Sequence, residues 1–293
     1  MTGPVLTPLG SRLGGRVDGI DLGGPLDGAT LDWIRNALDN RKVLVFPRQK
    51  LDAPAFHGFA SRLGELQHHV LRKYRHAEFP GLSWLTNVAQ DGSVDEFGVI
   101  RATSWHTDGS YTQEPPMLGI LYALEVPSRG GATIFADMCH AHDSLDAATR
   151  AKLSGLTGLH LHGAGPGGDM YDGSLADDQK EGYKDAVHPA VATHPRTGRK
   201  LLYVNATHTR KFAEMEAAES VALVKDLMTH ATQPDNLYTH DWSVGDLLIW
   251  DERSTMHRGA GDYPPTDRRI KLRAIVQTLA VGIAPGGQVD QGN

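Results

Sequence analysis

The chain has 293 residues, of which 40% are hydrophobic and 22% charged, and its formal net charge is -6 at pH 7. This composition is typical of a soluble globular protein, and the acidic balance argues against a nucleic-acid-binding protein, which would carry a basic stripe. The single cysteine, Cys139, excludes an internal disulfide and a cysteine-based zinc site. No apolar run is long enough to predict a membrane span and no signal peptide is recognisable, so we expect a cytoplasmic protein.

Short apolar runs between glycines and prolines recur along the chain, and several are rich in β-branched and aromatic residues. Such runs predict strands. The predicted strands cover residues 43–46, 82–85, 118–124, 132–136, 201–205, 247–250 and 270–280. Their irregular spacing does not fit repeating βαβ units.

Fewer segments place apolar residues at helical spacing. Helices are predicted over residues 28–40, 53–63, 142–154 and 214–230, with Asp52 as the N-cap of the second. The pattern indicates a mainly β fold with covering helices, and we expect a double-stranded β-helix (jelly roll) core. One domain should span residues 1–293. The Gly- and Asp-rich stretch 163–185 is expected to form a long active-site lid or loop.

The stretch "SWHTDGSY" (104–111) carries the first chemical signal. On a strand, His106 and Asp108 would project from the same face, because side chains two positions apart do so. His257, which follows the predicted strand 247–250 and a polar turn, is the best third ligand. Two histidines and one carboxylate leave neighbouring metal positions open, the arrangement diagnostic of non-haem Fe(II) oxygenases. The His-x-Asp pair alone is a weak signal in a chain with 15 histidines.

Two arginines share one face of the last predicted strand. Arg269 and Arg273 are four residues apart, and a buried guanidinium without an anionic partner is costly. They therefore predict either an inward-facing site for a carboxylate, to which arginine is suited, or pairing with protein acids such as Asp251 or Asp262. A third possibility is that both face solvent.

The chain resembles the TauD/TfdA family of Fe(II)/2-oxoglutarate-dependent dioxygenases over most of its length. The segments that carry the resemblance, in the family's order, are "VLVFPRQKLDAPAFHGFASRLGEL" (43–66), "WHTDGSY" (105–111), "VPSRGGATIFADM" (126–138), "HPRTGRKLLYVN" (194–205), "WSVGDLLIWDERSTMHRG" (242–259) and "RRIKLRA" (268–274). By this resemblance His106, Asp108 and His257 match the catalytic Fe(II) ligands. Thr133 and Arg269 match the residues that bind the distal carboxylate of 2-oxoglutarate, although Arg268 is a neighbouring candidate for the arginine.

The resemblance also implies substrate contacts. Arg273 matches an arginine that holds the substrate's anionic group in several family members, and His69 matches a substrate-contacting histidine. His208 falls near a pocket position and, with His69, favours a polar pocket. The implied reaction hydroxylates an unactivated C–H of a small anionic substrate with O2 and 2-oxoglutarate, and releases succinate and CO2. The substrate would be a sulfonate, a carboxylate or a phospho-compound, and the hydroxylated product could then cleave.

Other functions remain open on the sequence alone. One is an aryloxyalkanoate-type dioxygenase that acts on a more hydrophobic acid. Two further alternatives are a metal-dependent hydrolase, which needs no dicarboxylate clamp of arginine and threonine, and a non-catalytic cupin-like module. No nucleic-acid or membrane partner is expected, and we expect a homo-oligomer, either a dimer or a tetramer.

Overall fold

Strands form most of the framework, which confirms the predicted mainly β class with added helices. The structure is a computed structural model that describes residues 3–167 and 185–279. The strands of its larger sheet are β1 (Val5–Pro8), β2 (Gly15–Asp18), β3 (Val43–Phe46), β4 (Gly64–Leu66), β5 (Leu82–Thr86), β6 (Leu118–Glu125), β14 (Leu247–Asp251) and β16 (Ile270–Leu279). Within the described residues seven of these strands run in the order β1-β2-β3-β14-β6-β16-β4, and the eighth, β5, pairs with β16.

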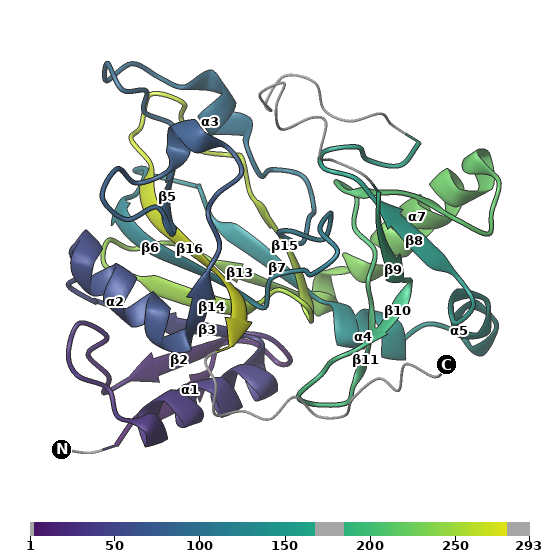
Figure 1. Ribbon diagram of the computed structural model, residues 1–293, viewed down its shortest axis with the longest axis horizontal. Helices are drawn as coiled ribbons and strands as arrows, with labels where there is room; N and C mark the ends of the chain where they lie inside the picture. Colours follow the sequence, from purple (N-terminus) through teal and green to yellow (C-terminus); the bar gives the residue numbers. More distant parts are fainter. Residues whose placement is uncertain (1–2, 168–184, 280–293) are drawn as a thin grey trace.

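A second, smaller sheet faces the first and carries part of the site. It consists of β13 (Leu237–His240), β7 (Thr133–Asp137) and β15 (Thr255–Gly259), in that order and antiparallel. Two further small sheets are made of β12 (Thr209–Phe212), β8 (Thr157–His160) and β9 (Ala186–Pro189), and of β10 (Val191–Thr193) and β11 (Lys200–Leu202). In Figure 1 these last two sheets lie to the right of the main sheets, beside the long helix α7 (Ala217–Ala231).

Helices cover one side of the larger sheet and also pack against the smaller sheets. The helices are α1 (Gly28–Arg41), α2 (Ala53–Leu63), α3 (Glu96–Ile100), α4 (Met138–Asp143), α5 (Ala147–Leu153) and α7, with short 3-10 helices η1 (Arg72–Tyr74) and η2 (Pro234–Asn236). Asp52 caps α2 as predicted, by accepting from the backbone N–H of Ala55. In the described part of the chain no helix combines the length and apolar character needed to cross a bilayer.

Successive side chains of β14 point alternately into two different hydrophobic cores. Leu247 and Ile249 pack into the core that the larger sheet shares with α1 and α2, which lie along one side of that sheet in Figure 1. Leu248 and Trp250 point to the other face, toward residues of the smaller sheet. The Trp250 ring lies 5.6 Å from the Phe135 ring of β7. Since successive strand residues face opposite sides, a continuous apolar run fits a strand that is buried on both faces.

Two predicted elements differ from the structure. The helix expected over residues 142–154 is interrupted, because α4 ends at Asp143 and a new helix begins after Asp146, whose side chain accepts from the N–H of Thr149. The strand expected over residues 201–205 ends at Leu202. Local capping by short acidic side chains overrides helical periodicity in the first case.

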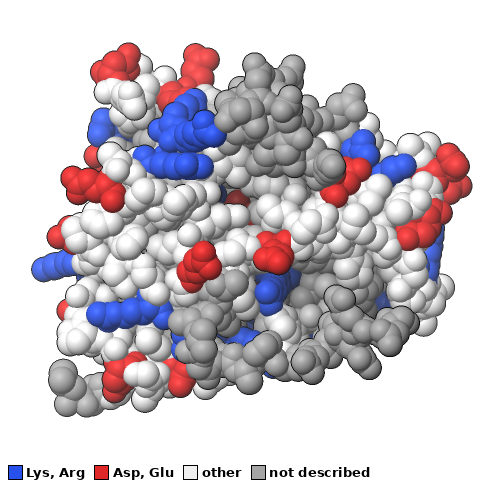
Figure 2. Space-filling model, viewed as in Figure 1, with Lys and Arg blue, Asp and Glu red and all other residues white. Residues whose placement is uncertain are grey.

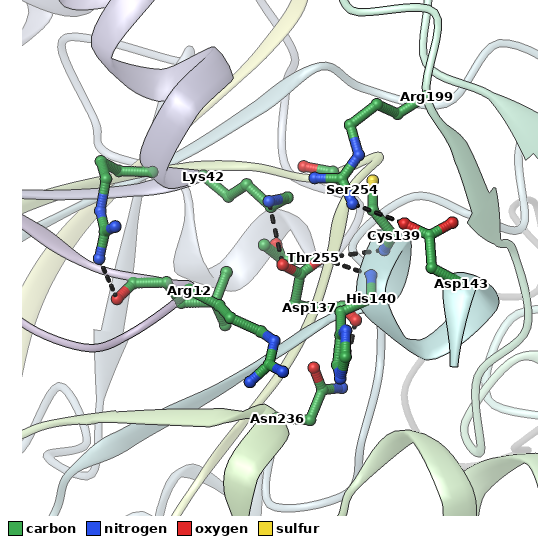
Figure 3. Close-up of polar contacts among 12 residues, drawn as sticks. Arg12, Lys42, Asp137, Cys139, His140, Asp143, Arg199, Asn236, Ser254 and Thr255 are labelled. Atoms are coloured by element: carbon green, nitrogen blue, oxygen red, sulfur yellow. Dashed lines mark hydrogen bonds and ion pairs between the residues drawn. The ribbon is translucent and has the colours of Figure 1, made fainter. Parts of the chain in front are cut away.

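A buried ion pair joins α1 to the smaller sheet and α4. Lys42, the left-handed C-cap of α1, lies with its Nζ 3.0 Å from the Asp137 carboxylate, and both side chains are at most 6% exposed. The same carboxylate accepts from the backbone N–H groups of Cys139 and His140, so it also caps α4 (Figure 3). The contact therefore ties three elements that are distant in sequence.

We expect Lys42→Ala to lower the free energy of unfolding by about 3–5 kcal/mol, because it leaves the Asp137 carboxylate buried without its cation. Urea denaturation measures this change. The exposed pair of Arg268 and Glu125 is the matched control, and Arg268→Ala should cause a much smaller change. Equal losses for the two variants would contradict a stabilising role for the buried pair.

Candidate metal centre and substrate pocket

The two histidines of the predicted triad are brought together by the backbone itself. His106 and His257 form an isolated antiparallel bridge, in which the N–H of each donates to the carbonyl of the other at 3.0 and 2.8 Å. His257 lies in β15, which pairs with β7, so its position is set by the smaller sheet. The imidazole centroids are 4.3 Å apart. Residues 151 positions apart in sequence (257 − 106) therefore become neighbours.

Asp108 completes the group, but not in the way the sequence predicts. The expected strand around His106 and Asp108 is absent from the described chain: His106 is a single bridge residue and Asp108 lies in the turn that follows. Gly109, with φ of 67°, lets the chain turn there, and a Cβ on it would lie 2.3 Å from Pro116. The turn brings the Asp108 carboxylate 3.9 Å from His106 Nε2 and 4.0 Å from His257 Nε2.

The geometry suits a divalent metal ion. One potential ligand atom from each of the three residues lies within 4.8 Å of the others. His106 Nδ1 lies 2.7 Å from the Ser104 carbonyl, so Nδ1 carries the proton and the Nε2 lone pair faces Asp108. Burial, with His106 nearby, lowers the pKa of His257 to about 3. The imidazole is therefore neutral at pH 7, the form that binds metals.

Asp108 is held as a carboxylate by its surroundings. Burial would raise the pKa of Asp108, but the Arg273 guanidinium and the two imidazoles outweigh it and hold that pKa well below its usual range. Arg273 Nη1 donates to both carboxylate oxygens at 3.3 and 3.2 Å. Of the acids considered from the sequence, Asp251 instead bonds to His194, and Asp262 to the N–H of Gly131.

The two residues expected to bind 2-oxoglutarate are buried, each with polar atoms that could serve an anion. Thr133 is 3% exposed, and its hydroxyl accepts from Trp242 Nε1 at 3.0 Å. Arg269 is 5% exposed, with its guanidinium 5.5 Å from the Tyr263 ring centroid, and its Nε has no partner among the described residues. Arg268, the alternative, is on the surface with Glu125.

A buried lysine that was not identified from the sequence lies on the strand face that Arg269 and Arg273 share. Lys271 lies two residues from both Arg269 and Arg273. It is fully buried, and its Nζ lies 3.5 Å from the Trp242 ring centroid. In the described chain no hydrogen-bond partner reaches this Nζ. Buried cationic donors without anions are costly, so this region fits an anionic group such as a carboxylate. Because residue 271 is two positions from each arginine, the two-residue period of a strand could have identified Lys271 from the sequence.

A pocket of about 340 Å³ opens onto the candidate metal centre. His106, Asp108 and Arg273 line it, and so do both histidines expected to contact substrate, His69 and His208. An apolar wall that the sequence analysis did not anticipate completes the lining: Val70, Leu71, Leu85, Phe97, Ile100 and Ile275. Figure 2 shows this face hollowed near its middle, with Lys and Arg side chains gathered over the region of α3.

In both pocket histidines, Nδ1 accepts a hydrogen bond from a nearby backbone N–H. His69 Nδ1 accepts from the N–H of Leu71 at 2.9 Å, and His208 Nδ1 accepts from the N–H of Gly163 at 3.0 Å. Burial holds the pKa of both rings well below the usual value, so both are neutral and carry their proton on Nε2. The expected lid 163–185 touches the site through Gly163, whereas residues 168–184 lie outside the described residues.

Arg101 is a pocket cation that the sequence analysis also missed. Its guanidinium lies 4.0 Å from the Tyr74 ring centroid, and Nη2 donates to the Trp84 carbonyl at 2.9 Å. Nη1 is buried and has no partner within the described residues. Burial lowers the pKa of Arg101 to about 10, so it remains charged at pH 7. No local pattern distinguishes it, since it lies in an irregular segment.

Comparison with known proteins agrees with this site. Residues 6–275 match the family model described as "Taurine catabolism dioxygenase TauD, TfdA family". The chain belongs to this family. It is 33% identical over 288 residues to the alpha-ketoglutarate-dependent 2,4-dichlorophenoxyacetate dioxygenase of Burkholderia sp. (strain RASC), covering 94% of each chain. It is 31% identical to the pentalenolactone F synthase of Streptomyces arenae, covering 92% of this chain and 94% of the relative.

A solved structure supports the same family. The crystal structure of AAD-2 in complex with Mn(II) and N-oxalylglycine has a TM-score of 0.82 and 30% identity, covering 98% of this chain and 100% of that chain. The TauD/TfdA chain described here is accordingly a 2-oxoglutarate-dependent dioxygenase, with Fe(II) as its metal cofactor and 2-oxoglutarate as its co-substrate.

We expect Asp108→Ala and His257→Ala each to weaken Mn(II) binding by more than about a hundredfold, since loss of a direct ligand should exceed the effect of losing a ligand's supporting partner. Titration of the metal-free protein, followed by the electron paramagnetic resonance of free Mn(II), measures this affinity. His142→Ala, beside Asp143 and outside the pocket, is the control. Unchanged affinity in either test variant would rule out that residue as a ligand.

Proposed function

We propose that this enzyme hydroxylates an unactivated C–H of an organic anion that carries an apolar body. His106, Asp108 and His257 bind the iron, and Thr133 and Arg269 bind the distal carboxylate of 2-oxoglutarate. The single observation that carries the substrate assignment is the pocket, in which a candidate metal centre, two arginines and an apolar wall meet. The sequence alone favoured a small polar anion, which would leave that wall unfilled.

The triad supports the metal assignment through its ligand chemistry. Two imidazoles and one carboxylate, grouped within 4.8 Å, suit a divalent first-row metal and leave positions open for other ligands. When bound, the iron together with 2-oxoglutarate and O2 supplies the chemistry that hydroxylates a C–H bond and yields succinate and CO2. If the hydroxylated carbon also bears a heteroatom, the product cleaves.

The chain's own residues bind and orient the two organic molecules. Arg269 Nε and the Thr133 hydroxyl offer donors in a buried region, where an ionic hydrogen bond is stronger than in water. Lys271 Nζ is a further buried hydrogen-bond donor on the same strand face, where burial holds the lysine's pKa well below its usual value. The apolar side chains of the pocket exclude water and hold the substrate's body.

Two arginines support an anionic substrate. Arg273 lines the pocket but is already bonded to Asp108, whereas Arg101, which also lines it, has a buried Nη1 without a partner in the described residues. We assign the substrate's anionic group to both guanidinium groups, with the neutral His69 and His208 as further donors. The aryloxy acid named for one relative has this combination of carboxylate and apolar ring. A sulfate or sulfonate on an apolar chain would fit equally.

Two other functions are less well supported. A metal-dependent hydrolase or a non-catalytic cupin-like module could use the same three metal ligands. Neither has a use for Arg269 Nε and Lys271 Nζ, two buried donors that lack hydrogen-bond partners in the described residues. These donors match a dicarboxylate co-substrate instead.

We also propose a fold type, a domain extent and an oligomeric state for the enzyme. The larger sheet and the smaller sheet of β13, β7 and β15 enclose one shared core, as expected of a double-stranded β-helix. The chain forms a single catalytic domain over residues 1–293, and the enzyme is a homo-oligomer, which sedimentation would test.

We expect Arg269→Ala to raise the KM for 2-oxoglutarate by about 10- to 100-fold, as loss of an ionic hydrogen bond predicts. Mn(II) affinity should stay unchanged, because Arg269 contacts none of the three ligands. The control is Arg268→Ala, which removes the exposed neighbouring guanidinium. An unchanged KM in Arg269→Ala would contradict the assignment.

A substrate panel tests the reaction and the role of Arg101. Succinate formation should be greatest with 2,4-dichlorophenoxyacetate or an n-alkyl sulfate, low with taurine, and lowest with the uncharged methyl ester of the aryloxy acid. Arg101→Met should raise the substrate KM about 10- to 100-fold while substrate-free decay of 2-oxoglutarate continues. The exposed Arg48→Met serves as control. Equal turnover of acid and ester, or a preference for taurine, would refute the proposed substrate class.

A further inference from the structure

A fully buried acid lies directly behind the candidate metal centre. Glu252 follows β14 and precedes β15, and its side chain is 0% exposed. Its Oε2 accepts from the backbone N–H of Asp108 at 3.1 Å. Its Oε1 has no hydrogen-bond partner in the described chain. The carboxyl therefore contacts the turn that carries one metal ligand, although the two residues are 144 apart in sequence.

The same oxygen faces the second ring nitrogen of a ligand histidine. His257 Nδ1 lies 4.0 Å from Glu252 Oε2, whereas His257 Nε2 faces Asp108. No described atom within hydrogen-bond distance partners this Nδ1, although it is buried. A histidine that binds metal through Nε2 carries its proton on Nδ1 and usually donates it to a carboxylate, a carbonyl or water. Glu252 Oε2 is the acceptor positioned for that proton.

We propose that Glu252 is a positioning residue for the metal centre, whose Oε2 holds two ligands in place at once. It anchors Asp108 through the backbone and, by accepting from Nδ1, keeps His257 in the tautomer that presents Nε2 to the metal. Oε2 accepts hydrogen bonds in either protonation state of the carboxyl group. The inference rests on the proposed metal centre and adds a residue that does not itself contact the metal.

The surrounding packing makes room for this carboxyl. A Cβ at Gly119, on β6, would lie 2.5 Å from Glu252 Oε1 and 2.2 Å from the Trp250 ring. Hence only glycine fits opposite the acid. The His257 ring is also held by its neighbours, with the Trp250 ring centroid 4.9 Å and the Phe135 ring centroid 5.8 Å away. The ring needs only a small shift to close the 4.0 Å gap to a hydrogen bond.

Two substitutions separate a positioning role from simple packing. Glu252→Met keeps a side chain of similar length but removes both acceptors, and we expect it to weaken Mn(II) binding by about 10- to 100-fold. Glu252→Gln retains an oxygen that can accept from both N–H groups, so its Mn(II) affinity should stay within about threefold of the unsubstituted protein, a small fraction of the effect expected for a lost supporting partner. Asp246→Asn alters a similar buried contact, between Asp246 and His240, outside the metal centre and should leave the affinity unchanged.

The outcomes distinguish this inference from the metal assignment itself. If the unsubstituted protein fails to bind Mn(II), both the proposed metal centre and the proposed role of Glu252 are refuted. If it binds Mn(II) and Glu252→Met binds equally well, only the role of Glu252 is refuted. Equal weakening in the Met and Gln variants would also refute it, because the shared acceptor oxygen would then not be what matters.

A spectroscopic measurement covers the case in which Glu252→Met does not fold. In the Zn(II)-loaded, ¹⁵N-histidine-labelled protein, we expect His257 to bind zinc through Nε2 and to show a slowly exchanging Nδ1–H proton. Zinc on Nδ1, or an Nδ1–H that exchanges as fast as one in water, would overturn the inference. This readout needs neither substrate nor activity.

Discussion

The antiparallel bridge between His106 and His257 is the contact on which the site depends. Two reciprocal backbone hydrogen bonds place the two imidazoles side by side, with ring centroids 4.3 Å apart. Backbone bonds fix position more strictly than side-chain contacts alone, since they constrain φ and ψ as well as distance. The third ligand then needs only a tight turn, which Gly109 permits. In a preformed site of this kind, little of the free energy of metal binding is lost to ordering the ligand side chains.

Unbalanced buried charge is the second organising feature. Arg101, Arg269 and Lys271 each keep a buried donor without a partner in the described residues. A fold that served stability alone would replace such groups with apolar ones, because burying an unpaired cation is costly. The ion pair of Lys42 and Asp137 shows the contrast, since there the buried cation has its anion at 3.0 Å. At the site, by contrast, single donor atoms of Arg101, Arg269 and Lys271 are left available for an anionic ligand.

Sequence reasoning succeeded where a local pattern maps directly onto geometry. Strand 247–250 and helix 53–63 followed from apolar spacing and an acidic cap. Arg269 shares a strand face with Arg273, which favoured it over Arg268, and the structure buries Arg269 and leaves Arg268 on the surface. It failed where tertiary contacts decide. The bridge partner of His106 lies far along the chain, so the sequence could not show that Asp108 leaves the strand direction. Arg101 and Glu252 carry no local signature, because their roles come from neighbours that only folding supplies.

The contact between Arg273 and Asp108 links the two binding events of the site. Among the described side chains, Arg273 is the main positive charge that balances the Asp108 carboxylate. A divalent cation held by the triad adds two positive charges beside the same carboxylate, and so weakens the attraction that holds Arg273 there. The guanidinium then gains freedom to bind an anion in the pocket. On the assignment proposed above, metal binding and anion binding at Arg273 share one carboxylate, and thermodynamic linkage makes their coupling reciprocal.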